Sequence, residues 1–188
     1  MAKITSVKGR LIYNSRGSKT IEVDVLSDNQ YLGRTCAPSG ASVGKYEAVS
    51  FPNDSQEESL RILTENSKKF LGLDPSDLKA IHETIKSIDK TPNYSEIGGS
   101  IAYAVTIASM ESASKVIGKP LFRLISEQSE YRFPIPLGNI LGGGAHAGPG
   151  TPDIQEILIS ATNAKTVREA IQTNLAVHKE LRKVIEKT

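Results

Sequence analysis

Residues 20–25 of this chain read Thr-Ile-Glu-Val-Asp-Val, and this strict alternation of polar and apolar side chains is its clearest structural signal. A period of two predicts a β-strand with its three apolar side chains on one face. Residues 4–13 alternate more loosely and are linked to this run by Asn14-Ser15-Arg16-Gly17-Ser18. The turn-forming stretch 27–30 leads into a third run, residues 31–37. The sequence therefore predicts a three-stranded antiparallel meander whose apolar face needs a cover.

Three helical patterns follow the meander and supply that cover. Residues 55–69 begin with a serine suited to the N-cap and carry leucines at helical spacing. Apolar residues three and four positions apart predict a second helix over residues 78–88. The third pattern, residues 98–117, is rich in alanine and serine, which predicts close packing, and Gly118-Lys119-Pro120 ends it. We expect residues 1–125 to form one α+β domain.

A second unit is expected over residues 133–188. An apolar run from Pro134 to Leu141 ends in three glycines, a strand is predicted over residues 154–161, and an amphipathic helix starts at about Lys165. The apolar stripe of that helix is predicted to be Val167, Ala170, Ile171, Leu175, His178, Leu181 and Ile185. Two strands and one helix do not close a core, so we expect this unit to be incomplete and the chain to be truncated.

The composition excludes several classes of protein. The 188 residues carry 23 Lys+Arg against 21 Asp+Glu. The formal net charge of +2 is too small to create the positive electrostatic potential that a nucleic-acid-binding surface needs. No apolar run approaches the roughly 18 residues of a membrane span, and the N-terminus does not resemble a signal peptide. Cys36 is the only cysteine, which excludes an internal disulfide. We therefore expect a cytoplasmic protein without a membrane span.

One candidate functional segment follows the meander, Pro38-Ser39-Gly40-Ala41-Ser42-Val43-Gly44-Lys45-Tyr46-Glu47. It departs twice from a phosphate-binding P-loop, because Ser39 stands where the first glycine belongs and Tyr46 replaces the magnesium-binding Ser/Thr. Its glycines and serines favour a mobile loop that closes over a ligand, with Ser42 offering an oxygen to a hard cation. The alternative is a plain turn between sheet and helix.

The second candidate segment is the glycine-rich stretch 142–150, which carries His146 and is followed by Gln155 and Glu156. A dinucleotide-binding loop is disfavoured because prolines follow where a helix should begin. The neighbours of His146 are small, so its ring is free to face a ligand, although a structural histidine is the alternative. Gln155 and Glu156 are adjacent and reach one site only if the strand's twist or its end aims both side chains there.

Together these segments resemble the enolases, the glycolytic phosphopyruvate hydratases. Residues 14–24 are similar to the family's opening signature, residues 38–48 to its mobile loop, and residues 143–156 to the loop and strand that open its barrel. The departures are Asn14 for Asp, Ser18-Lys19 for Asn-Pro, Gly142 for Asn, and one extra residue between His146 and Glu156. The sequence of residues 151–156 resembles that of the archaeal branch of the family.

The resemblance implies an α+β N-terminal capping domain, residues 1–125, followed over residues 133–188 by the first strands and helix of an enolase-type (β/α)8 barrel. It implies the reversible dehydration of 2-phosphoglycerate to phosphoenolpyruvate, a lyase reaction of glycolysis. Two Mg2+ ions per active site would stabilise the enediolate formed from the substrate carboxylate. The family also implies a homodimer.

Carried over onto this sequence, the family's catalytic residues are His146 and Glu156. The substrate-binding residues are these two with Gln155 and Ala41, and the metal ligand is Ser42. In the family the lysine base, the acid and the other metal ligands come from later strands, so we expect the 188-residue chain alone to be inactive. The alternative is a naturally short, non-catalytic binding module derived from an enolase. Another member of the superfamily is disfavoured by the loop at residues 39–47.

Overall fold

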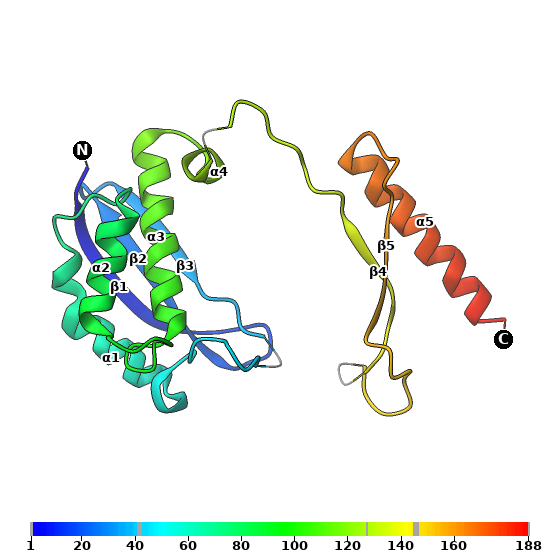
Figure 1. Cartoon of the computed structure of the whole chain (residues 1–188), viewed down its shortest axis with the longest axis horizontal. Coiled ribbons are helices and arrows are strands. Elements are labelled where there is room, and N and C mark those ends of the chain that lie inside the picture. The colour runs from blue at the N-terminus through cyan, green and yellow to red at the C-terminus, as the bar shows by residue number, and fades with distance from the viewer. Residues whose placement is uncertain (1, 41–42, 127, 145–146, 188) are drawn as a thin grey trace. The chain divides into compact units, whose positions relative to one another are not determined.

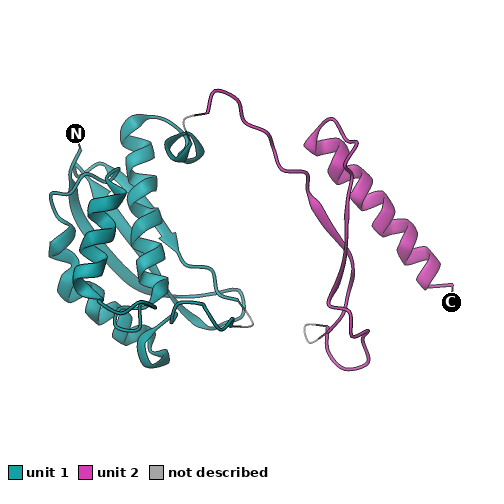
Figure 2. Ribbon diagram, viewed as in Figure 1, with its two compact units in different colours: residues 1–127 teal, residues 128–188 magenta. Residues whose placement is uncertain are grey.

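The computed structural model describes residues 2–40, 43–126, 128–144 and 147–187. The chain divides into two compact units, residues 1–127 and residues 128–188 (Figure 2). No helix in the described part of the chain is both long enough and apolar enough to cross a membrane.

The first unit opens with the predicted meander. Strands β1 (Ile4–Tyr13), β2 (Lys19–Ser27) and β3 (Tyr31–Cys36) form an antiparallel sheet in the order β1-β2-β3 (Figure 1). The apolar side chains of the alternating stretch, Ile21, Val23 and Val25, are all buried on one face, as predicted. A register shift between Ile4 and Ser6 marks a bulge near the start of β1.

Helices follow the sheet as expected, with small differences at their ends. They are η1 (Pro52–Asp54), α1 (Gln56–Asn66), η2 (Ser67–Phe70), α2 (Leu78–Ile88), α3 (Gly99–Ile117) and α4 (Leu121–Ile125). The predicted helix over residues 55–69 is therefore an α-helix that continues as a 3-10 turn. Ser55 caps α1 by accepting a hydrogen bond from the Glu58 backbone N–H at 3.1 Å, and Gly118 ends α3 in the left-handed region at φ 70°.

The core of the first unit lies between the sheet and these helices. Helix α3 packs against β2 and β3, and α1 packs against β1. The expected close packing of α3 is confirmed at Gly33, where an added Cβ would lie 1.8 Å from the carbonyl oxygen of Ala108 and 2.6 Å from the backbone nitrogen of Ser112. The Ser112 hydroxyl also lies 2.7 Å from the Ser27 hydroxyl and 2.8 Å from the Tyr31 carbonyl oxygen, which ties α3 to the sheet by hydrogen bonds.

One fully buried carboxylate, Asp89, organises the connection between α2 and α3. It accepts hydrogen bonds from the backbone N–H and the hydroxyl of Thr91, at 2.8 and 2.5 Å, and from the backbone N–H groups of Glu96 and Ile97, both at 2.9 Å. Burial alone would raise the pKa of Asp89, but these donors favour the charged form and the net pKa is lowered. The charged side chain therefore holds this segment together.

The second unit contains the predicted hairpin and long helix. Strands β4 (Leu137–Gly142) and β5 (Glu156–Ser160) pair antiparallel, and α5 (Val167–Ile185) follows, with Thr166 as its N-cap. The strand predicted over residues 154–161 starts two residues late, because residues 154 and 155 belong to the loop that closes on Gly143. An added Cβ at Gly143 would lie 2.3 Å from the Ile154 carbonyl oxygen.

Only a small part of α5 is covered. The predicted apolar stripe contributes one buried residue, Ala170, whereas Ile171 is 45% and Leu175 is 64% exposed. The other buried side chain, Asn174, was not part of the predicted stripe. Its side-chain amide donates a hydrogen bond to the Pro136 carbonyl oxygen, just before β4, at 3.0 Å. Asn174 is therefore buried by a hydrogen bond, which a pattern of apolar residues does not predict.

Candidate functional site

The loop after β3 contains the first set of predicted site residues, and its start is bonded to the β1–β2 connection. The Asn14 side-chain oxygen accepts from the backbone N–H groups of Arg16 and Ser18, at 2.9 and 3.0 Å. The Asn14 amide in turn donates to the Ser39 hydroxyl oxygen at 3.3 Å. Ala41 and Ser42, predicted to bind substrate and metal, lie outside the described residues.

The far end of the same loop is bonded to the helical part of the unit. The Gly44 N–H donates to the Glu47 carboxylate at 2.8 Å. The Val49 N–H donates to the Asn93 carbonyl oxygen at 2.9 Å, and the Gly99 N–H at the start of α3 donates to the Val49 carbonyl oxygen at 2.7 Å. The described residues that flank positions 41 and 42 are thus hydrogen-bonded to the rest of the unit on both sides.

The second set of site residues lies on the β4–β5 hairpin of the other unit. At the base of its loop, the Gly143 N–H donates to the Gln155 carbonyl oxygen at 2.8 Å and the Gly144 N–H donates to the Pro152 carbonyl oxygen at 2.7 Å. Gly144, Gly148 and Gly150 all have positive φ, which favours glycine over other residues. His146, the predicted catalytic histidine, lies outside the described residues.

Gln155 and Glu156 stand where this loop ends. Glu156 is the first residue of β5 and lies opposite Gly142 in the ladder, and Gln155 immediately precedes the strand. Both residues are exposed. Among the residues that the structure describes, neither side chain has a hydrogen-bond partner. The hairpin therefore leaves the two side chains exposed at the point where the loop ends.

The described residues do not assemble a magnesium site. Mg2+ requires several oxygen ligands in near-octahedral geometry, yet no group of three or more His, Cys, Asp or Glu side chains within the described ranges could hold a metal ion. Ser42, the predicted metal ligand, is not among those residues. The side chains of the described residues therefore do not provide the ligands of a complete Mg2+ centre.

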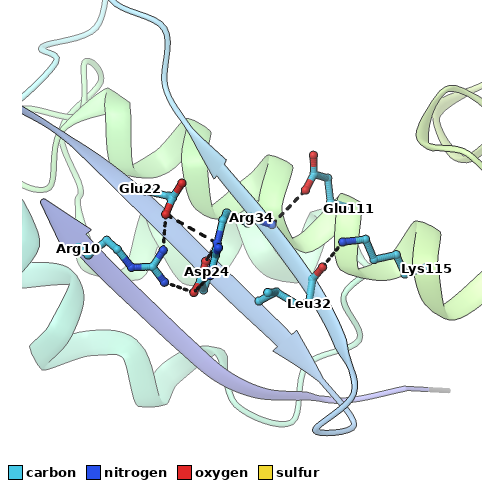
Figure 3. Close-up of polar contacts among 7 residues, drawn as sticks. All are labelled: Arg10, Glu22, Asp24, Leu32, Arg34, Glu111 and Lys115. Carbon is cyan, nitrogen blue, oxygen red and sulfur yellow. Dashed lines mark hydrogen bonds and ion pairs between the residues drawn. The ribbon is translucent and has the colours of Figure 1, made fainter. Parts of the chain in front are cut away.

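A charged cluster on the outer face of the sheet was missed by the sequence analysis. Arg10 bonds to both Glu22 and Asp24, and Arg34 forms a two-point pair with Asp24, Nε–Oδ1 at 2.7 Å and Nη2–Oδ2 at 2.9 Å (Figure 3). The Arg34 hydrogen bonds, joined by those of Arg10, outweigh partial burial and lower the pKa of Asp24. The alternation of Glu22 and Asp24 with the buried residues of β2 predicts that both lie on the outer face. Which arginines they pair with depends on the register of the strands, which the alternation does not give.

Comparisons with known proteins cover almost the whole chain. The family model described as the enolase N-terminal domain matches residues 4–125, and the model described as the enolase C-terminal TIM barrel domain matches residues 130–188. The enolase of Methanothermobacter thermautotrophicus is 42% identical over 188 residues. The enolases of Methanosphaera stadtmanae and Archaeoglobus fulgidus are 39% and 37% identical over 184 and 183 residues.

These matches extend over nearly all of this chain but over less than half of each archaeal relative. They cover 98%, 97% and 97% of this chain against 44%, 44% and 45% of the three archaeal proteins, in the same order. The matched barrel segment contains β4, β5 and α5, so the antiparallel hairpin is a partial segment of that domain.

Proposed function

This chain belongs to the enolase family, and from that premise we propose that it is the N-terminal part of a phosphopyruvate hydratase. The complete enzyme would reversibly dehydrate 2-phosphoglycerate to phosphoenolpyruvate as a cytoplasmic homodimer of glycolysis and gluconeogenesis. The observation that carries the proposal is the succession of two family matches, residues 4–125 and 130–188, in a chain 42% identical to an archaeal enolase.

In this proposal the loop after β3 acts as a lid. Ala41 would contact substrate, and the Ser42 hydroxyl would bind a metal ion when the lid closes. The described residues on either side are held to the unit by the Asn14–Ser39 and Val49–Asn93 hydrogen bonds, as the fixed ends of such a lid would be.

The hairpin of the second unit would supply the polar groups around the leaving hydroxyl. His146 would lie against the phosphate and the departing oxygen, Glu156 would belong to the network that handles its proton, and Gln155 would bind substrate. Support comes from the glycine-rich turn, whose Gly143–Gln155 hydrogen bond closes the loop's base and leaves both exposed side chains at its mouth.

When bound, the two proposed Mg2+ ions would stabilise negative charge that develops on the substrate carboxylate. Because the described residues do not fit a complete metal centre, the remaining ligands and the base must come from elsewhere in a full-length enzyme. We therefore expect the 188-residue chain alone to form no phosphoenolpyruvate from 2-phosphoglycerate and Mg2+. Turnover by the purified chain would contradict this division of the site.

A chimera tests the proposed function directly. Residues 1–188 are joined to the remainder of the Methanothermobacter thermautotrophicus enolase, and phosphoenolpyruvate formation is measured. We expect turnover, and we expect Glu156→Gln to lower kcat by about 100-fold or more, the usual contribution of a proton-transfer group. Glu180→Gln, on α5, is the matched control and should leave kcat within twofold. A folded dimeric chimera without activity would refute the proposal.

A non-catalytic binding module is the second candidate, and the exposed side chains of α5 favour it. Leu175 and Val184 are 64% and 62% exposed and would form a docking surface in a naturally short protein. Intact-mass analysis of the native protein, captured from source cells by an antibody against unit 1, separates the two candidates. A species near 20.3 kDa supports the module, and one more than twice as heavy supports the enzyme.

A further inference from the structure

One hydrogen bond joins the β1–β2 turn to the loop after β3, between residues that are 25 positions apart in the sequence (Figure 1). The side-chain amide of Asn14, the residue that follows β1, donates to the Ser39 hydroxyl oxygen at 3.3 Å. Asn14 is half-buried and Ser39 is exposed. Among the described residues, Asn14 is the only hydrogen-bond partner of residues 38–40. The bond therefore ties the start of this loop to the sheet.

The turn that carries Asn14 is held by its own hydrogen bonds. The Asn14 N–H donates to the Ser18 carbonyl oxygen at 2.9 Å, and the Asn14 carbonyl oxygen accepts from the Gly17 N–H at 3.0 Å. The Asn14 side-chain oxygen accepts from the N–H groups of Arg16 and Ser18. These two donors fix which side of the amide is the oxygen, so the NH2 group is the one that faces Ser39. The turn is therefore a firm support for this donor.

The turn itself does not need the NH2 group of Asn14. Both side-chain bonds within the turn use the Asn14 oxygen, and an aspartate, which the enolase signature has at this position, would supply the same acceptor. Within the described residues, the NH2 group bonds only to Ser39. The donor that distinguishes asparagine from aspartate therefore acts on the loop after β3 and not on the turn.

Ser39 stands where the proposed lid begins. Pro38 restricts the backbone before it, whereas Gly40 after it has the widest choice of backbone conformations. Ala41, which is proposed to contact substrate, is two residues further along the chain, and two extended residues span at most about 7 Å. Holding Ser39 in one place therefore limits the region that Ala41 can reach.

We propose that Asn14 is a positioning residue for the lid: its side-chain NH2 group holds Ser39, so that the lid starts from one place before substrate binds. This inference rests on the proposed function, in which the loop after β3 closes over substrate. A loop that starts from a fixed point loses less conformational entropy when it closes, so the bond favours substrate binding. Asn14 does not touch the reacting atoms, so the bond leaves the chemical step unchanged.

The test uses the chimera described above and begins with Ser39→Ala, which removes the acceptor and leaves the turn intact. We expect the KM for 2-phosphoglycerate to rise about three- to tenfold, the scale of one hydrogen bond, and kcat to change less than about twofold. Ser87→Ala on α2 is the matched control, because it removes another exposed hydroxyl, which donates to the Thr84 carbonyl oxygen at 2.7 Å. It should change neither constant. A folding defect would lower the concentration of active enzyme without raising KM, so KM separates positioning from a purely structural role.

Variants of Asn14 test the donor. In Asn14→Asp the carboxylate still accepts from Arg16 and Ser18, and the Ser39 O–H can rotate to donate to it, so KM should stay within about twofold of the wild type. Asn14→Ala removes the bond and should raise KM at least as much as Ser39→Ala does. Adding Ser39→Ala to Asn14→Ala should then have no further effect, because both changes remove the same interaction. Additive effects would mean that the two side chains act separately and would overturn the proposal.

NMR of the 188-residue chain observes the bond without any catalysis. The side-chain NH2 signals of Asn14 should shift in Ser39→Ala and stay in place in Ser87→Ala. An active chimera in which Ser39→Ala leaves KM unchanged would overturn this inference alone, and so would Asn14 signals that Ser39→Ala does not shift. A chimera without activity would refute the proposed function, and this inference would fall with it.

Discussion

Replacing Asp89 by asparagine should destabilise unit 1 by about 2–6 kcal/mol. The asparagine oxygen can still accept from Thr91, but its NH2 group would face the backbone N–H groups of Glu96 and Ile97, which the second carboxylate oxygen accepts at 2.9 Å. Two donors are then left without an acceptor, and each buried unsatisfied donor costs about 1–3 kcal/mol. The lower bound applies if water reaches the Glu96 N–H, which is only partly buried.

Urea unfolding followed by the helical circular dichroism signal measures this loss, because the chain contains no tryptophan. Asp77→Asn is the matched control: Asp77 caps α2 by accepting from the Ala80 N–H at 3.0 Å, and an asparagine oxygen does the same. We expect the control to change stability by less than about 0.5 kcal/mol. Equal shifts for both variants would refute the proposed role of Asp89.

The pH dependence of the free energy of unfolding is a second test of the role of Asp89. The pKa of Asp89 is lowered in the folded protein, so its charged form stabilises the fold above the pKa of the unfolded chain, about 4. That contribution is lost as the pH falls through the lower folded-state pKa. The stability difference between the wild type and Asp89→Asn should therefore be constant from pH 7 to pH 5 and shrink below about pH 4. A difference that grows in acid would reverse the assigned sign.

Three further outcomes follow from packing. Gly33→Ala should cost more than about 3 kcal/mol in urea unfolding, because its Cβ would overlap the Ala108 carbonyl oxygen. Gly142→Ala should be nearly neutral, because its Cβ would make only an ordinary 3.8 Å contact with the Asn139 side-chain nitrogen. An unchanged urea midpoint for Gly33→Ala would contradict the α3 packing. Ser59→Ala removes a buried 2.8 Å hydrogen bond to the Ile97 carbonyl oxygen and should cost about 1–2 kcal/mol, with a neutral result excluding that bond. Amides of β4 and β5 should exchange at least tenfold faster than those of β2, and equal protection would mean that unit 2 is better covered than its side chains indicate.

The meander was predictable because its decisive residues alternate. Burying Ile21, Val23 and Val25 together requires a period of two, and no helix places them on one face. The close approach of α3 was also predictable from its small side chains, although the particular contact between Gly33 and Ala108 depends on which strand lies beneath the helix. Local sequence therefore predicts which elements form, and tertiary packing decides which residues meet.

The candidate site was less predictable from local pattern, for physical reasons. The charged cluster needs the register that pairs Arg10 with Glu22 and Arg34 with Asp24, and that register is fixed by two turns rather than by the charges. In the second unit, Asn174 is buried by a hydrogen bond to a backbone carbonyl. The start of β5 is delayed by a backbone contact at Gly143. None of these features has a hydrophobic period.

The two units differ in how far they bury their own apolar side chains. Variants in unit 1 therefore test the stability of a core, whereas the proposed catalytic residues Gln155 and Glu156 lie in the less buried unit 2. Unit 1 encloses large side chains such as Phe70, Leu63 and Ile101, so variants at Asp89 or Gly33 report on a core that unit 1 supplies alone. Unit 2 buries Ala170 and leaves Leu175 mostly exposed, so its hairpin is held chiefly by the β4–β5 ladder. Gln155 and Glu156 sit at the end of that ladder. In the proposed enzyme, their positions would become rigid enough for catalysis only when further structure covers α5 and the hairpin, which is why Glu156→Gln must be tested in the chimera rather than in the 188-residue chain.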